Sequence, residues 1–178
     1  MKIETYPPGP PEFKAWDPHV TSVADEVAAW LTSKIPGTRI EHVGSTAIPQ
    51  CAGKGIIDLL VLYSAGDLER VRDAIDGLGF QKQPTGHLFP EERPMRVGLI
   101  HKGNHAFKIH THILLESCEE ARNLCSFRDA LMSDSQLCEE YVALKKEILS
   151  RSVQDPEEYT DAKATFFQNH PPGTVSIE

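Results

Sequence analysis

A single acidic residue inside an apolar run is the feature that most constrains this chain. Residues 56–62 read Ile-Ile-Asp-Leu-Leu-Val-Leu, and Asp58 is the polar member of the run. A nearly continuous apolar run of this length predicts a β-strand covered on both faces. A buried carboxylate is costly unless it is paired, hydrogen-bonded or bound to a metal ion. We therefore expect Asp58 to meet a cation or a hydrogen-bond donor within the fold.

The segment before this strand predicts a turn that can hold an anion. Gly44, Ser45 and Thr46 follow a short expected strand over residues 39–43. Glycine permits a tight turn, and free backbone N–H groups at a helix start bind anions. A turn of this kind, followed by an acid on the next strand, is the minimum needed to handle a phosphate group with its metal ion.

The string from His42 to Val61 resembles the signature of the GrpB-like family, which is close to H-[IV]-G-S-T-[AS]-[VI]-P-G-L-x-A-K-P-I-I-D. Strings at 127–129, 141–145 and 159–163 resemble the family's F-R-D-x-L, Y-x-x-L-K and Y-x-x-x-K. The resemblance implies a nucleotidyltransferase-like fold in which a Gly-Ser turn and a strand aspartate form half of the active site. This chain departs from the signature at Gln50, Cys51 and Gly55, which leaves the orientation of Lys54 open.

Composition favours a soluble protein with one domain, expected over residues 12–170, with flexible tails at 1–11 and 171–178. The chain has 178 residues and a formal net charge of -8. That charge argues against long nucleic acid as a partner, because binding to many phosphates needs a basic surface. It allows a small nucleotide or another phosphorylated ligand. The oligomeric state stays open.

The four cysteines and the apolar runs predict a cytoplasmic protein. The cysteines form no C-x-x-C pair, so free thiols in a reducing compartment are expected. No apolar run approaches the roughly 20 residues needed to span a bilayer, and the N-terminus has no signal-peptide core.

The periodicity predicts an α+β fold: a nucleotidyltransferase-like mixed sheet flanked by helices, with a helical C-terminal segment. Helices are expected from Asp17, Asp67, Ser117 (in a capping box with Glu120), Asp134 and Asp155. Strands are expected at 39–43, 56–62, 80–83, 95–101 and 105–115.

Alternation in the last of these strands places His110 and His112 on one face. Two imidazoles at this spacing suit joint metal ligation or the binding of a phosphate. A solvated strand face with two ordinary histidines is the alternative. The resemblance favours the first interpretation, because the family also carries an H-x-H on a late strand.

Basic residues in the strings that resemble the family are candidates for an anion-binding pocket, namely Lys54, Arg128, Lys145 and Lys163. Arginine forks match phosphate, and lysine supplies a point charge. Helix-surface charges in local ion pairs are the alternative for the last three. Lys54 has two further alternatives, since it can neutralise Asp58 or face solvent.

Three functions follow from these residues. The first is nucleotidyl transfer to a small acceptor with magnesium or manganese, which the resemblance implies. That chemistry usually needs an Asp-x-Asp or Asp-x-Glu pair, and this chain has Leu60 at the partner position. The second is a catalytically reduced module that binds a nucleotide or phosphate ligand. The third is a metal-dependent hydrolase with Asp58, His110 and His112 as ligands; imidazoles favour zinc or manganese over magnesium.

Overall fold

The computed structural model describes residues 1–7, 9, 12–84, 89–150, 165–166 and 169–170. Its elements in chain order are α1 (His19–Lys34), β1 (Arg39–Val43), the short 3-10 helix η1 (Ser45–Ala47), β2 (Ile56–Tyr63), α2 (Leu68–Gly77), β3 (Gln81–Lys82), β4 (Met95–Lys102), β5 (His105–Leu115), α3 (Glu119–Ser133) and α4 (Ser135–Ser150). The predicted strands at 39–43 and 105–115 match β1 and β5 at both ends.

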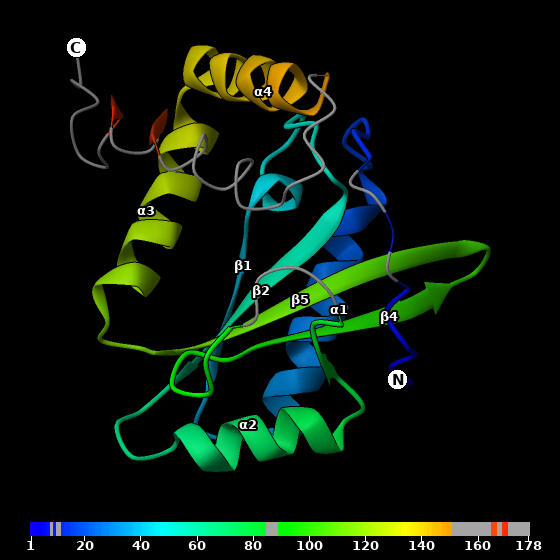
Figure 1. The fold of residues 1–178 in the computed structure, drawn as a ribbon, viewed down its shortest axis with the longest axis vertical. Helices are drawn as coiled ribbons and strands as arrows, with labels where there is room; N and C mark the ends of the chain where they lie inside the picture. The colour runs from blue at the N-terminus through cyan, green and yellow to red at the C-terminus, as the bar shows by residue number, and fades with distance from the viewer. Residues whose placement is uncertain (8, 10–11, 85–88, 151–164, 167–168, 171–178) are drawn as a thin grey trace.

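The strands form one mixed sheet in the order β1-β2-β5-β4-β3 (Figure 1). β2 and β5 are parallel, and the other neighbouring pairs are antiparallel. The parallel pairing joins strands that are far apart in the sequence and sets Asp58 opposite His110. The acid-bearing strand β2 is therefore an interior strand, paired on both sides, as its apolar composition predicts.

One face of the sheet packs against α1 and α2 and forms the main core. Ile57, Leu59 and Val61 of β2 lie on this face beside Ile109 and Ile113 of β5, and all five are fully buried. These are alternate residues of each strand, so the residues between them point to the opposite face of the sheet. The alternation thus decides that Asp58 points away from the main core.

On the opposite face, α3 packs against one end of the sheet. Leu60, Leu62 and Leu114 pack with Val43 against Ala121 of α3. In Figure 1, α3 lies beside β1, and α4 lies above the loop between β1 and β2. Asp58 lies two residues before Leu60 on this face, outside the cluster that packs against Ala121 of α3, and its side chain is 29% exposed.

The helix starts expected at Asp17 and Asp134 agree with the structure. Asp17 accepts a hydrogen bond from the backbone N of His19 at 2.9 Å, and Asp134 accepts one from Leu137 at 2.9 Å. At α3 the expected capping box is wrong: Sγ of Cys118 accepts from Ala121, and Glu120 pairs with Arg93 instead. No helix in the described part of the chain is both long and apolar enough to cross a membrane. The helix expected from Asp155 lies outside the described residues.

The N-terminal segment differs from the expected flexible tail over residues 1–11. Glu4 pairs with Leu99 through two backbone hydrogen bonds of 2.8 and 3.1 Å, and Ile3 is 9% exposed. The physical reason is that β3 pairs only with Val97 and Arg96, which leaves the rest of the β4 edge open. Residues 8, 10–11 and the second expected tail, 171–178, lie outside the described residues.

Candidate metal centre

Asp58, His110 and His112 form a cluster on the sheet face opposite the main core. Nδ1 of His110 lies 3.5 Å and Nε2 of His112 lies 3.7 Å from Oδ1 of Asp58. One ligand atom from each residue lies within 4.8 Å of the other two. The parallel pairing of β2 with β5 produces this cluster, because it places the histidine face of β5 beside Asp58.

These separations fit a single metal ion. With metal–ligand distances of about 2.0–2.2 Å, two ligands of a tetrahedral ion lie about 3.4 Å apart. The two distances from Asp58 are close to this value. Nδ1 of His112 is also buried and has no hydrogen-bond partner among the described residues. With a metal ion on Nε2, Nδ1 would carry the proton and would need an acceptor from outside the described residues.

His110 has the protonation state that a metal ligand needs. Burial lowers its pKa to about 4, although the carboxylate of Asp58 acts in the opposite direction. The imidazole is therefore neutral at pH 7, as ligation requires. Its second nitrogen, Nε2, lies 3.2 Å from the hydroxyl of Tyr6. Tyr6 thus orients the ring, in the way that outer partners of metal-bound histidines do.

Two residues of this site were not predicted from the sequence. Tyr6 comes from the segment expected to be flexible, and burial raises its pKa to about 12, so its hydroxyl keeps the proton. Phe89 lies edge-on to His112, with ring centroids 5.9 Å apart. Neither residue belongs to a periodic pattern, so the sequence carries no signal for them apart from their being aromatic residues next to prolines.

The turn before β2 is built against the carboxylate of Asp58. Gly44 has φ 73° and ψ -175°, a conformation that is essentially restricted to glycine. A Cβ at this position would lie 2.5 Å from Oδ2 of Asp58. The glycine of the predicted turn is therefore required because its backbone touches the acid.

The hydroxyl groups of the turn have different surroundings. Oγ1 of Thr46 donates to the carbonyl of Ile56 at 3.0 Å and lies 2.9 Å from Nε2 of His42. Thr46 is buried, so its hydroxyl holds the turn to the sheet. Ser45 is half-buried and faces Gly53, where an added Cβ would lie 2.5 Å from Oγ. Of the two hydroxyls, that of Ser45 is the better placed for a ligand.

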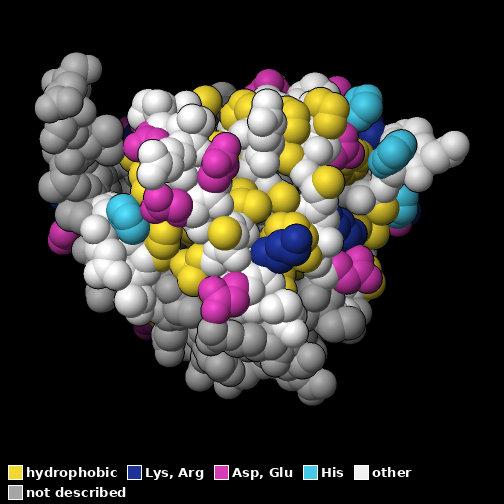
Figure 2. Space-filling model, turned by 90° about the horizontal axis from the view of Figure 1, so that it is seen from above, with side chains coloured by type: hydrophobic (Ala, Val, Ile, Leu, Met, Phe, Trp, Pro, Cys, Tyr) yellow, Lys and Arg dark blue, Asp and Glu magenta, His cyan; other side chains and the backbone are white. Residues whose placement is uncertain are grey.

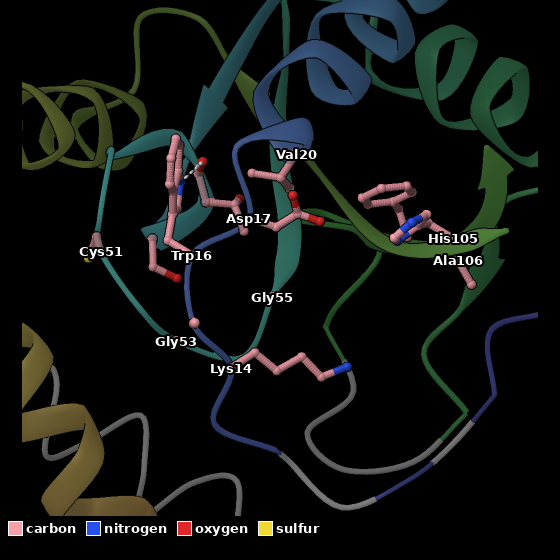
Figure 3. A pocket seen from close by; sticks show the side chains of 13 residues that line it. Lys14, Trp16, Asp17, Val20, Cys51, Gly53, Gly55, His105 and Ala106 are labelled. Carbon is pink, nitrogen blue, oxygen red and sulfur yellow. Dashed lines mark hydrogen bonds between the residues drawn. The ribbon is translucent and has the colours of Figure 1, made fainter. Parts of the chain in front are cut away.

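A cavity of about 200 Å³ lies next to this turn and not over the Asp58 cluster (Figure 3). Its lining includes Ser45, Thr46, Cys51 and Gly53 from the signature segment. Trp16, whose indole N–H donates to the carbonyl of Thr46 at 3.2 Å, forms another wall. The signature segment therefore borders two features, the Asp58, His110 and His112 cluster on the sheet and the cavity beside the turn.

The sequence matches the pattern of the GrpB protein family over residues 10–171. This chain belongs to the GrpB family. A UPF0157 protein from Pseudomonas aeruginosa is 32% identical over 169 residues, which are 91% of this chain and 63% of that relative. A UPF0157 protein from Halalkalibacterium halodurans is 26% identical over 86% of this chain and 76% of its own length. The chain thus spans less than two thirds of the P. aeruginosa relative.

A solved structure of a GrpB protein agrees on the fold of this GrpB-family chain. GrpB from Enterococcus faecalis superposes with a TM-score of 0.64 at 19% identity and covers 89% of this chain and 99% of that one. The Cid1 poly(U) polymerase reaches a TM-score of 0.48 at 15% identity over 75% of this chain and 40% of its own, which is too distant to indicate a function. The expected α+β fold, with a mixed sheet flanked by helices, is confirmed.

The basic candidates from the family-like strings lie in different places. Besides burial, the charge of Lys54 contributes to lowering the pKa of His110, so Lys54 is close to the cluster of Asp58, His110 and His112. Arg128 donates to Oε2 of Glu41 at 2.8 Å and to the carbonyl of His42 at 2.9 Å, which ties α3 to β1. Lys145 is buried under the signature segment. Lys163 lies outside the described residues.

The face seen in Figure 2 carries no continuous basic surface in its described part. Lysine and arginine side chains lie there between acidic and hydrophobic ones, and several histidines gather at one edge. This pattern agrees with the net charge of -8. A small pocket with a local cation is a better match to this face than an extended phosphate backbone.

Leu60 occupies the position that the second acid of an Asp-x-Asp pair would take after Asp58. Leu60 is fully buried beneath α3, next to Leu62 and Ala121. Its partner across the parallel pair is His112. The two histidines of β5 therefore lie beside Asp58 and Leu60, and only the first of these two positions of β2 holds a carboxylate.

Proposed function

We propose that this GrpB-family protein binds one divalent transition-metal ion through Asp58, His110 and His112, and hydrolyses a small phosphorylated ligand such as a nucleotide. The observation that carries the proposal is the cluster of one carboxylate and two imidazoles within 4.8 Å of one another. Three protein ligands leave positions open for water and substrate, which is the usual arrangement of a catalytic metal site.

The donor set favours zinc or manganese. Two imidazoles with one carboxylate suit transition metals, whereas magnesium prefers oxygen ligands and retains its waters. When bound, such an ion would polarise a phosphoryl oxygen and lower the pKa of a bound water. Magnesium, which the family resemblance first implied, is the weaker candidate for this site.

The protein's own residues prepare the site for an anionic ligand. Tyr6 holds the ring of His110, and the glycine backbone of Gly44 lies against Asp58. Lys54 brings a positive charge close to His110, where it can receive a phosphate oxygen. The side chain of Asp58 is 29% exposed, which gives a ligand access to its carboxylate.

Nucleotidyl transfer is the second candidate function. It is favoured by the contact between Gly44 and Asp58, because a Gly-Ser turn against a strand acid is what the family resemblance implies for such an active site. It is disfavoured by Leu60, since two-metal chemistry needs a second bridging acid on that strand. A binding module without catalysis would keep the ligand site and lack turnover.

Calorimetric titration with zinc, manganese and magnesium tests the metal site. We expect one zinc or manganese ion per chain, weak magnesium binding, and loss of the tight site in His112→Asn. His101→Asn is the matched control, because His101 is an exposed histidine on the neighbouring strand β4. Equal binding by wild type and His112→Asn would refute the metal site.

Product analysis then separates the three functions. The metal-loaded protein is incubated with nucleoside triphosphates and monophosphates, with and without a small alcohol acceptor. Hydrolysis predicts release of phosphate or pyrophosphate without an acceptor. Nucleotidyl transfer predicts pyrophosphate release that needs the acceptor, and a binding module predicts a shift in melting temperature without any product.

A further inference from the structure

A lysine lies at one end of the cluster formed by Asp58, His110 and His112. Lys108 precedes His110 by two residues on β5, so both side chains leave the same face of the sheet. Nζ of Lys108 lies 5.0 Å from the ring centroid of Tyr6, whose hydroxyl is 3.2 Å from Nε2 of His110. Lys108 is half-buried, and within the described part of the chain no carboxylate forms an ion pair with it. It therefore brings a positive charge to this end of the cluster.

An arginine lies at the other end of the cluster. Cζ of Arg93 is 4.9 Å from the ring centroid of Phe89, and that ring lies edge-on to His112 with 5.9 Å between the centroids. Glu120 of α3 accepts hydrogen bonds from Nε of Arg93, at 2.6 Å, and from its Nη2. A guanidinium has five N–H donors, and the other three donate to no acceptor among the described residues. Arg93 is therefore held in place by Glu120 and keeps donors for a ligand.

The register of β4 and β5 places the two cations on opposite sides of the cluster. The carbonyl of Pro94 accepts a hydrogen bond from the backbone N–H of Ile113 at 2.9 Å, so the preceding Arg93 lies beyond the cluster along β5. Lys108 lies before the cluster on the same strand. The two imidazole rings of the cluster, with centroids 6.5 Å apart, lie between the cations. A single phosphate group cannot contact both cations across these rings, whereas a chain of phosphate groups can.

We propose that Lys108 and Arg93 bind the two ends of a chain of phosphate groups that lies across the cluster, and that they select such a chain over a single phosphate. The fork of an arginine matches phosphate oxygens, and a lysine supplies a point charge. This assignment rests on the proposed function, because the ligand is the phosphorylated one of the same site. The chain is either free polyphosphate or part of a nucleotide.

Calorimetric titration of the metal-free protein with phosphate, pyrophosphate and tripolyphosphate tests the selection of a chain. Metal ions are left out because phosphate chains bind them in solution. We expect affinity to rise along this series, with tripolyphosphate at least about tenfold tighter than phosphate, which is the scale of one hydrogen bond to a charged group. Equal affinities for phosphate and tripolyphosphate in the wild-type protein would overturn the proposal.

Lys108→Gln and Arg93→Gln each remove one of the two charges. We expect each substitution to weaken tripolyphosphate binding about tenfold, because one charge-assisted contact is lost. Lys102→Gln and Arg122→Gln are the matched controls, since they remove an exposed lysine and an exposed arginine outside the cluster. Similar losses in the test and control variants would reduce the preference to net charge and overturn the proposal.

Titration with a nucleoside triphosphate identifies the source of the chain. Tighter binding than tripolyphosphate would show that a nucleoside adds contacts, and equal or weaker binding would favour a free chain. In either case we expect Lys108→Gln and Arg93→Gln to weaken binding as they do for tripolyphosphate. Nucleotide binding that neither substitution weakens would contradict the role of the two cations.

Zinc titration separates this proposal from the proposed function. Neither Lys108 nor Arg93 is a metal ligand in the proposed site, so both variants should bind zinc as the wild type does. A wild-type protein that prefers tripolyphosphate but binds no zinc would refute the metal site and leave the two cations supported. Zinc binding without any preference for the chain would refute the cations alone. Circular dichroism checks the fold of each variant, and the wild-type series with Lys108→Arg, which keeps the charge and should keep the preference, decides the proposal if Lys108→Gln does not fold.

Discussion

Nδ1 of His110 lies 3.5 Å from Oδ1 of Asp58 because the two residues are register partners in the parallel pair of β2 and β5. The same register places His112 beside Leu60. The H-x-H spacing thus brings two imidazoles to one carboxylate, while the second position of β2 stays apolar. This relationship supports a site for one metal ion and not for two.

Tyr6→Phe tests how the N-terminal segment supports the metal site. The substitution removes the hydroxyl that lies 3.2 Å from Nε2 of His110. Loss of such an outer partner typically weakens metal affinity about 10- to 100-fold. We expect a loss in this range for zinc in calorimetry. Tyr63→Phe, at the far end of β2, is the control, and equal affinity in the two variants would show that Tyr6 does not orient the ligand.

Gly44→Ala tests the contact between the turn and the acid. Gly44 has φ 73°, and an added Cβ would lie 2.5 Å from Oδ2 of Asp58. We expect the free energy of unfolding to fall by about 3 kcal/mol or more, since backbone strain and the clash add. Gly66→Ala is the control because Gly66 also has positive φ, at 92°, but has open space around it. Urea unfolding measures both, and a similar loss in the two variants would rule out the clash.

Leu60→Asp tests whether position 60 can accept a second carboxylate. The new carboxylate would be buried beneath α3 without a partner, and we expect at least about 3 kcal/mol of destabilisation in urea unfolding. Leu60→Met keeps the volume and should cost less than about 1.5 kcal/mol. A stable Leu60→Asp variant that gains magnesium-dependent pyrophosphate release would contradict our assignment of this position to the core.

Glu91→Gln tests an ion-pair network away from the site. Hydrogen bonds from Lys82 and Arg96 lower the pKa of Glu91 from 4.5 to about 2. A carboxylate with a lowered pKa stabilises the fold above its unfolded pKa, and this stabilisation is lost as the pH falls through the folded pKa. We expect Glu91→Gln to be less stable than wild type at pH 7 and the difference to shrink between pH 4.5 and pH 2.

Urea unfolding at several pH values measures this difference. Glu92→Gln is the control, because Glu92 is an exposed neighbour. A difference between Glu91→Gln and wild type that stays constant down to pH 2 would mean that the network does not hold the charge of Glu91.

Local patterns predicted much of the fold. The alternation in residues 105–115 placed His110 and His112 on one face, and the structure confirms this. Asp134 was predicted to cap the helix that follows it, and its side chain accepts a hydrogen bond from the backbone N–H of Leu137, three residues away. Features of this kind depend on neighbours in the chain, so they can be derived from spacing alone.

Contacts between distant residues were not predictable in this way. The segment containing Ile3 and Glu4 was expected to be flexible, yet it pairs with β4, since β3 leaves part of that edge open. Lys145 was interpreted as a candidate for an anion pocket or as a surface charge, and the structure buries it against Cys51. Burial of a lysine depends on what packs over it, which helical spacing does not contain.

The sequence by itself determined that an acid lies within an apolar strand, that a glycine turn precedes it, and that two histidines share a face of a later strand. Periodicity and turn chemistry are properties of adjacent residues, and they suffice for these statements. Only the tertiary structure decided that β2 and β5 are neighbours and parallel, which brings Asp58 to His110 and His112. Strand pairing across about fifty residues depends on the free energy of the whole packed sheet, and no short stretch of the chain carries that information.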